Sequence, residues 1–107
     1  MLAYGRDPYF AGWPDTLQLD YSNPATQEAM VGELLKIAEQ CDGLRCDMAM
    51  LLLNDIFERT WGTRAGVKPV DDYWTTVIPA IRAKWPEFRF IAEALLPFSI
   101  SASCWRC

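Results

Sequence analysis

The sequence predicts one small α/β unit with parallel strands. Its 107 residues leave room for a single domain or for part of a larger one, because typical domains contain roughly 100–200 residues. Hydrophobic residues make up 51% of the chain and charged residues 22%, which is a globular composition. Segments with strand and helix patterns alternate along the chain, an order typical of parallel strands joined by right-handed crossovers. We therefore expect strands backed by helices around one core.

The N-terminal part is predicted to be a long loop that leads into a helix. Residues 1–20 are rich in Pro, Gly, Asp and aromatic residues, as surface loops are, and "TLQLDY" (16–21) has a strand-like pattern. Asn23 and Pro24 then supply a capping residue and a proline suited to the first helical position. Through residues 24–40 apolar residues recur every three or four positions, which predicts an amphipathic helix.

Two further strands are predicted on either side of helical segments. "GLRCD" (43–47) and "FRFIAEA" (88–94) have the length and flanking residues of strands. "AMLLLNDIFERTW" (49–61) has helical spacing and follows the first of these strands directly. The order favours a parallel return of the second strand beside the first.

A second long helix is predicted between a Gly- and Pro-containing loop and the last strand. Asp71 or Asp72 can cap its N-terminus, and Pro86 should end it. Pro79 lies inside the helical pattern. Because proline has no backbone N–H to donate, we expect a kink or an interruption of the helix at this residue.

Charge and composition argue against several classes of protein. The net charge is −4 and the basic residues are scattered, so we expect no nucleic-acid partner. No apolar run approaches the ~20 residues of a membrane-spanning helix, so we expect no membrane insertion. The Met1 end lacks the pattern of a signal peptide, which favours the cytoplasm. The absence of histidine excludes Ser-His and Cys-His catalysis and His-ligated metals within these residues.

The four cysteines are expected to be free thiols, because the chain is apolar enough to fold without a disulfide scaffold. Cys104 and Cys107 form a C-x-x-C pattern, which can lower a thiol pKa or bind zinc. The pattern is neither preceded by a strand nor followed by a helix, so we expect no metal site and no cofactor. A thiol module remains an alternative function.

Charged residues occur at the ends of both predicted strands. Arg45 and Asp47 lie two residues apart, so their side chains share one face, while Leu44 and Cys46 point toward the helices. Glu93 ends the next strand in the same way. In a closed barrel these ends lie at the mouth, where barrel active sites occur. We therefore expect two carboxylates on one rim.

Paired carboxylates at strand ends suit glycoside hydrolysis, with retention of configuration at a separation of roughly 5 Å. Arg45 should keep Asp47 ionised, which makes Asp47 the candidate nucleophile. The apolar neighbours of Glu93 predict burial, which raises a carboxyl pKa toward the range of a useful acid. The alternative interpretation is an internal ion pair, with a glutamate that caps a helix or is solvated and has no catalytic role.

These segments resemble glycoside hydrolase family 13, the α-amylase family. "GLRCD" matches that family's strand-four motif, G-x-R-x-D, at Gly43, Arg45 and Asp47. "FIAEA" resembles the strand-five motif, with the acid glutamate at Glu93. "WPDTLQLDYSNPATQEAM" is similar to the segment before strand four, so the resemblance covers about residues 4–95.

The resemblance implies a fragment of a (β/α)8 TIM barrel, roughly strands three or four to five with the intervening helices, over residues 1–96. It implies that Asp47 is the nucleophile, that Glu93 is the general acid/base, and that Arg45 orients the nucleophile and contacts substrate. The implied substrate is an oligo- or polysaccharide, an α-glucan, and the full-length family domain can bind calcium.

Trp13 fits this resemblance, whereas other positions depart from it. Trp13 on the N-terminal loop is a candidate for stacking on a sugar ring, although such an aromatic residue can equally serve packing. Many family members carry Lys-His three and four residues after the nucleophile, where this chain has Met50 and Leu51. The family's motifs on strands three and seven, the latter with a third catalytic aspartate, have no counterpart within these residues.

The C-terminal residues 97–107 form an atypical tail, which suggests a truncated or frame-shifted product. A barrel without its other strands has open sheet edges, so we expect no hydrolase activity from this chain alone. The alternative is a non-catalytic relic or an interaction protein derived from the same barrel.

Overall fold

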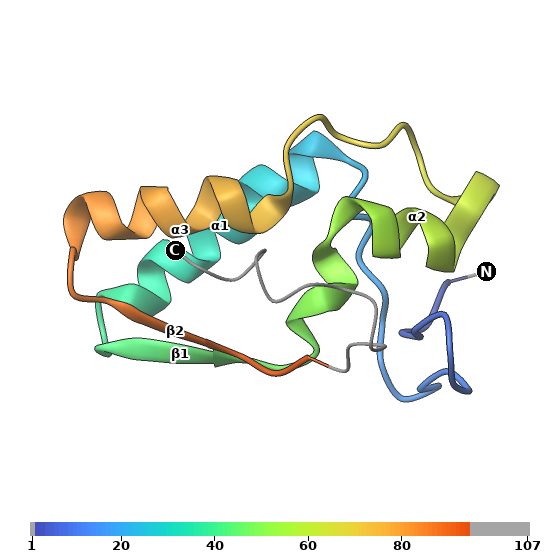
Figure 1. The fold of residues 1–107 in the computed structure, drawn as a ribbon, viewed down its shortest axis with the longest axis horizontal. Coiled ribbons are helices and arrows are strands. Elements are labelled where there is room, and N and C mark those ends of the chain that lie inside the picture. Colours follow the sequence, from blue (N-terminus) through green and yellow to red (C-terminus); the bar gives the residue numbers. More distant parts are fainter. Residues whose placement is uncertain (1, 95–107) are drawn as a thin grey trace.

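The computed structural model describes residues 2–94, in which two long helices lie side by side on one face of a small sheet (Figure 1). The expected tail at 97–107, with Cys104 and Cys107, lies outside the described residues. The elements in chain order are α1 (Pro24–Ala38), β1 (Gly43–Cys46), the 3-10 helix η1 (Ala49–Leu52), α2 (Asn54–Trp61), the 3-10 helix η2 (Gly62–Arg64), α3 (Tyr73–Lys84) and β2 (Arg89–Ala92).

The sheet confirms the predicted parallel pairing. β1 and β2 run parallel, with Gly43 opposite Arg89 and Cys46 opposite Ala92. The expected strand at 16–21 is wrong, because this segment pairs with neither strand. Leu17, in this segment, is 62% exposed, so its apolar pattern does not mark a buried face. A two-stranded sheet does not test the expectation of a barrel fragment, which stays a prediction.

Helix α1 begins where its sequence predicts. The side chain of Asn23 accepts a hydrogen bond from the backbone N–H of Ala25 at 2.9 Å, and Pro24 occupies the first helical position. The cap satisfies one of the N–H groups that the first turn leaves without a helical partner.

The helical pattern of residues 49–61 divides into η1 and α2. Leu53 between them is extended, with ψ at 131°. The break allows a distant loop to cap α2: Asp72 Oδ1 accepts the N–H of Asn54 at 2.6 Å, and the Asn54 amide donates to the carbonyls of Pro69 and Asp71. Tertiary hydrogen bonds therefore set this helix boundary.

Helix α3 begins after Asp72, one of the two predicted capping residues, and ends just before Trp85 and Pro86. The carbonyl of Asp72 accepts the N–H of Thr75 at 3.0 Å, while its carboxylate is used for α2. Of the kink or interruption expected at Pro79, the interruption is wrong, since α3 continues through this residue, and the kink stays a prediction. Pro79 is exposed, so the carbonyl that loses its helical partner can bond to water.

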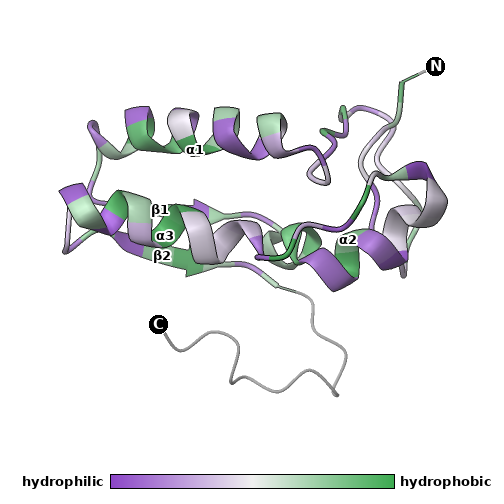
Figure 2. Ribbon diagram, turned by 90° about the horizontal axis from the view of Figure 1, so that it is seen from above, coloured by the Kyte–Doolittle hydropathy of each residue, from purple (hydrophilic) through white to green (hydrophobic). Residues whose placement is uncertain are grey.

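The core lies between the helices and the inner face of the sheet. Hydrophobic and hydrophilic residues are interspersed along α1 and α3, as expected of amphipathic helices (Figure 2). Leu44 and Phe90 from the two strands pack against a cluster of buried residues, namely Ala38, Tyr73, Val77, Ile81 and Phe88. Two layers of secondary structure thus share one small core, and the opposite face of the sheet carries Arg45, the charged residue of β1.

Candidate functional site

Strand alternation places Arg45 on the face of the sheet that the helices do not cover. Leu44 packs against the core and Cys46 lines a cavity with residues of α3, whereas Arg45 is exposed. The predicted division of β1 into two faces is therefore confirmed. The outer face carries Arg45, and the chain continues directly into Asp47.

Parallel pairing brings the carboxyl ends of the two strands together. The N–H of Glu93 donates to the carbonyl of Cys46 at 2.9 Å, and the N–H of Ala49 donates to the carbonyl of Glu93 at 2.9 Å. These two hydrogen bonds continue the pairing of the strands one residue past their ends. Asp47 lies between Cys46 and Ala49, the two residues that bond to Glu93. The expected meeting of the two strand ends is confirmed, while the catalytic roles stay predictions.

One guanidinium contacts both carboxylates. Arg45 Nη2 lies 2.9 Å from Glu93 Oε2, and Arg45 Nη1 lies 3.8 Å from Asp47 Oδ2. The planar fork of arginine suits such paired contacts. We call these three residues the strand-end cluster. It gathers one cation and two anions at the carboxyl ends of adjacent parallel strands.

The expected apolar surroundings of Glu93 are wrong. Ile91 is 65% exposed, Ala92 is also exposed, and the Glu93 side chain itself is 43% exposed. The reason is that no other described element covers the outer face of the sheet. Glu93 holds the closer ion pair with Arg45, although the sequence pattern favours Asp47 as the closer partner.

Met48 adopts a left-handed backbone conformation directly after Asp47. Its φ is 48° and its ψ is 41°, and it is the only non-glycine residue with positive φ among residues 2–94. Such a conformation costs about 1–3 kcal/mol, and strained residues cluster at functional sites. The turn directs Ala49 back toward β2, and the Trp74 indole donates to the Ala49 carbonyl at 2.8 Å. No sequence signal marks this turn, because Met is not a turn residue.

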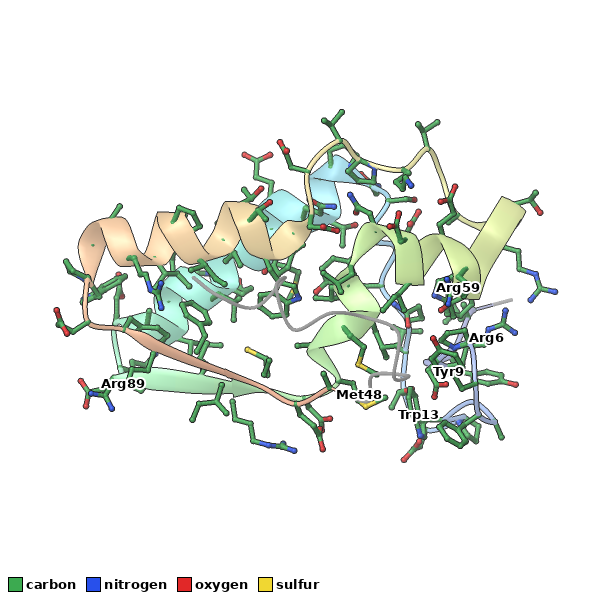
Figure 3. The ribbon with its side chains drawn as sticks, in the orientation of Figure 1. Arg6, Tyr9, Trp13, Met48, Arg59 and Arg89 are labelled. Carbon is green, nitrogen blue, oxygen red and sulfur yellow. The ribbon has the colours of Figure 1, made fainter. Side chains whose placement is uncertain are left out.

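Trp13, the other candidate for substrate contact, belongs to the N-terminal loop, which lies beyond the carboxyl ends of the strands (Figures 1 and 3). Its N–H donates to the carbonyl of Gly5 at 2.7 Å, and its carbonyl accepts from Thr16. These hydrogen bonds stay within the loop, and none joins Trp13 to the strand-end cluster.

A small apolar cavity of about 170 Å³ lies on the helix side of the strand ends. Cys46, Trp74, Ile78 and Phe90 contribute to its walls. Burial raises the pKa of the Cys46 thiol, which disfavours the reactive thiolate. This cavity therefore lacks the activated nucleophile that thiol chemistry needs.

Within residues 2–94, no group of three or more Cys, Asp or Glu side chains is arranged to hold a metal ion. In the same part of the chain, no helix combines the length and the apolar character needed to cross a membrane. Comparisons with protein-family models, with curated proteins and with solved structures found no match.

Proposed function

We propose that this chain is part of the catalytic domain of a retaining glycoside hydrolase of the α-amylase type, acting on α-glucans. The observation that carries the proposal is the strand-end cluster, in which Arg45 contacts the carboxylates of Asp47 and Glu93 at the ends of two adjacent parallel strands. The motifs around these residues, which resemble those of glycoside hydrolase family 13, supply the substrate class.

The two carboxylates take different roles in this proposal. Asp47 attacks the sugar carbon and forms a covalent glycosyl-enzyme, while Glu93 protonates the departing oxygen. Glu93 then removes a proton from water, which attacks the same carbon and releases the sugar. Arg45 orients the Asp47 carboxylate.

The ion pairs suggest how the site changes when it binds substrate. Glu93 must carry a proton in the first step, and a neutral acid gains less from a guanidinium than a carboxylate does. Arg45 should therefore exchange its 2.9 Å contact with Glu93 for a closer contact with Asp47.

Stability alone does not explain the strand-end cluster. Its side chains are 43–71% exposed, and exposed ion pairs contribute about 0–1 kcal/mol. The left-handed backbone at Met48 costs about 1–3 kcal/mol at the same place. Charged side chains that contribute little stability and lie next to strained backbone are more typical of a functional site than of a structural ion pair.

The chain by itself is not expected to hydrolyse glucans. Water reaches both carboxylates, whereas catalysis needs a site that excludes bulk water and orients the substrate. Met50, at a position where many family members bind sugar through Lys, is 1% exposed and belongs to the interior. Further substrate contacts have to come from other segments of a barrel.

A chimera tests the proposal. Residues 4–95 replace the corresponding segment of an active α-amylase, and release of reducing sugar from starch is measured. We expect activity that is lost on Asp47→Asn and on Glu93→Gln, with Lys36→Gln on the surface of α1 as the control that retains it. A chimera that folds, binds starch and shows no activity would overturn the proposal.

The second candidate function is that of a non-catalytic interaction protein. The observation in its favour is the outer face of the sheet, where Ile91 is 65% exposed, and within residues 2–94 each of the two strands has one unpaired edge. Exposed strand edges are ready surfaces for pairing with another chain. The folded but inactive chimera described above is the outcome that favours this function.

A further inference from the structure

The N-terminal loop and the C-terminal half of α2 line a second cavity, which is open to solvent and has a volume of about 450 Å³. It shares no lining residue with the strand-end cluster. Figure 3 shows Arg6, Tyr9 and Arg59 gathered at this end of the molecule. We call it the loop cavity; its walls include Tyr4, Asp7, Tyr9, Phe10, Arg59 and Thr60.

The loop that forms this cavity is held in place by its own side chains. Asp7 is 4% exposed, and its Oδ1 accepts the backbone N–H groups of Tyr9 at 2.7 Å and Phe10 at 2.9 Å. Arg6 donates to the carbonyl of Thr60 at 2.5 Å and lies over the ring of Trp61, 4.9 Å from its centroid. The cavity is therefore preformed, which lowers the entropic cost of binding a ligand.

Two buried polar atoms beside the loop cavity have no hydrogen-bond partner among residues 2–94, namely Asp7 Oδ2 and Arg6 Nε. Buried polar atoms are nearly always hydrogen-bonded, so an unpartnered pair requires an explanation. One atom is an acceptor and the other is a donor. Both lie beneath the surface of the cavity with almost no accessible area, so a ligand in the cavity contacts the more exposed groups of the loop rather than these atoms.

The exposed walls combine aromatic rings with the guanidinium of Arg59. Tyr9 is 43% exposed and Phe10 68% exposed, so their rings are available for contact. Arg59 is exposed, with Nη1 3.4 Å from the Tyr9 hydroxyl. The exposed lining of the cavity is more polar than apolar, which suits a ligand that presents hydroxyl groups.

The charges favour a neutral ligand. An anion attracted by Arg59 meets the carboxylate of Asp7, and a cation meets two arginines and only one carboxylate. A saccharide presents apolar C–H faces to the rings of Tyr9 and Phe10 and hydroxyl groups to Arg59 and the Tyr9 hydroxyl. We propose that the loop cavity is a saccharide-binding site distinct from the strand-end cluster. Its chemistry does not depend on the proposed glycosidase function.

A titration of the full, isotope-labelled chain with maltotriose, followed by amide NMR shifts, tests this inference. We expect saturable shifts at the N–H groups of Tyr9 and Phe10 and at the Arg59 side chain. Arg59→Gln should weaken binding about tenfold, because a hydrogen bond to a charged group is lost. The matched control is Arg64→Gln on η2, which removes the same charge outside the loop cavity and should leave the affinity within twofold.

Other outcomes would overturn the inference. Maltotriose shifts that vanish in an Asp47→Asn, Glu93→Gln double variant but persist in Arg59→Gln would assign the sugar to the strand-end cluster. Shifts produced by sodium phosphate and not by maltotriose would identify an anion site, and no saturable shift with either probe would exclude both. If Arg59→Gln does not fold, Tyr9→Phe replaces it, since it removes one hydroxyl and should weaken binding severalfold.

Discussion

The guanidinium of Arg45 lies 2.9 Å from the carboxylate of Glu93, closer than its 3.8 Å approach to Asp47 on its own strand. Arg45 therefore lies closer to its partner across the sheet, Glu93, than to Asp47, its neighbour in the sequence. The parallel register sets this preference, because it holds the backbone of Glu93 against the end of β1.

We predict that Arg45→Met changes the free energy of unfolding by about 1 kcal/mol or less, because both ion pairs are exposed to water. Urea unfolding of the purified chain measures it. Glu33→Gln breaks another exposed pair, Lys36–Glu33 at 2.7 Å, and serves as the matched control. A loss of more than about 3 kcal/mol would show that the cluster is structural and would favour the non-catalytic interpretation.

Met48→Gly should stabilise the chain by about 0.5–1 kcal/mol. Glycine adopts the left-handed conformation freely, and this gain exceeds the entropy that glycine adds to the unfolded chain. The control is Ala49→Gly in η1, which should lose about 1 kcal/mol because its backbone is helical. Thermal unfolding of both variants gives the comparison, and equal destabilisation by the two would contradict the strain at Met48.

Asp72→Ala should destabilise the chain by about 0.5–2 kcal/mol, the usual cost of removing a helix cap. The carboxylate of Asp72 caps α2 through the N–H of Asn54 at 2.6 Å, so the loss should appear as fraying of α2 in amide hydrogen exchange. Asp71→Ala removes the same charge from the adjacent exposed residue and should have little effect. Faster exchange in α3 with α2 unchanged would refute the assignment.

Tyr73→Phe should be neutral or stabilising by about 1 kcal/mol. Tyr73 is 2% exposed and its hydroxyl has no hydrogen-bond partner among the described residues, so the variant removes an unsatisfied polar group without changing the ring. Chemical unfolding near neutral pH measures the difference. A loss of more than about 2 kcal/mol would reveal a hydrogen bond to the hydroxyl.

The same tyrosine predicts an alkaline loss of stability. Burial raises the pKa of Tyr73 well above its ordinary value of 10.0, and burial also raises the pKa of Tyr21. Below the pKa of the unfolded state both states are protonated and stability is unchanged. As the pH rises above about 10, only the unfolded chain ionises readily, so stability falls. Unfolding at pH 8 and pH 11 should show a smaller fall in Tyr73→Phe than in the parent chain.

The sequence by itself determined the features that depend on neighbouring residues. Asn23 and Pro24 specify the start of α1, because the cap joins residues two positions apart. Alternation along β1 places Leu44 toward the helices and Arg45 away from them, because strand geometry has a period of two. The order of strands and helices indicates the parallel pairing.

Only the tertiary structure decided the features that depend on distant partners. The segment 16–21 has a strand pattern but pairs with neither strand, and a strand exists only where a neighbour completes its hydrogen bonds. The helical pattern breaks at Leu53 because the distant Asp72 caps the N–H of Asn54. Arg45 lies closer to Glu93, and the N-terminal loop lines an open cavity with α2, because folding brings together groups that lie far apart along the chain.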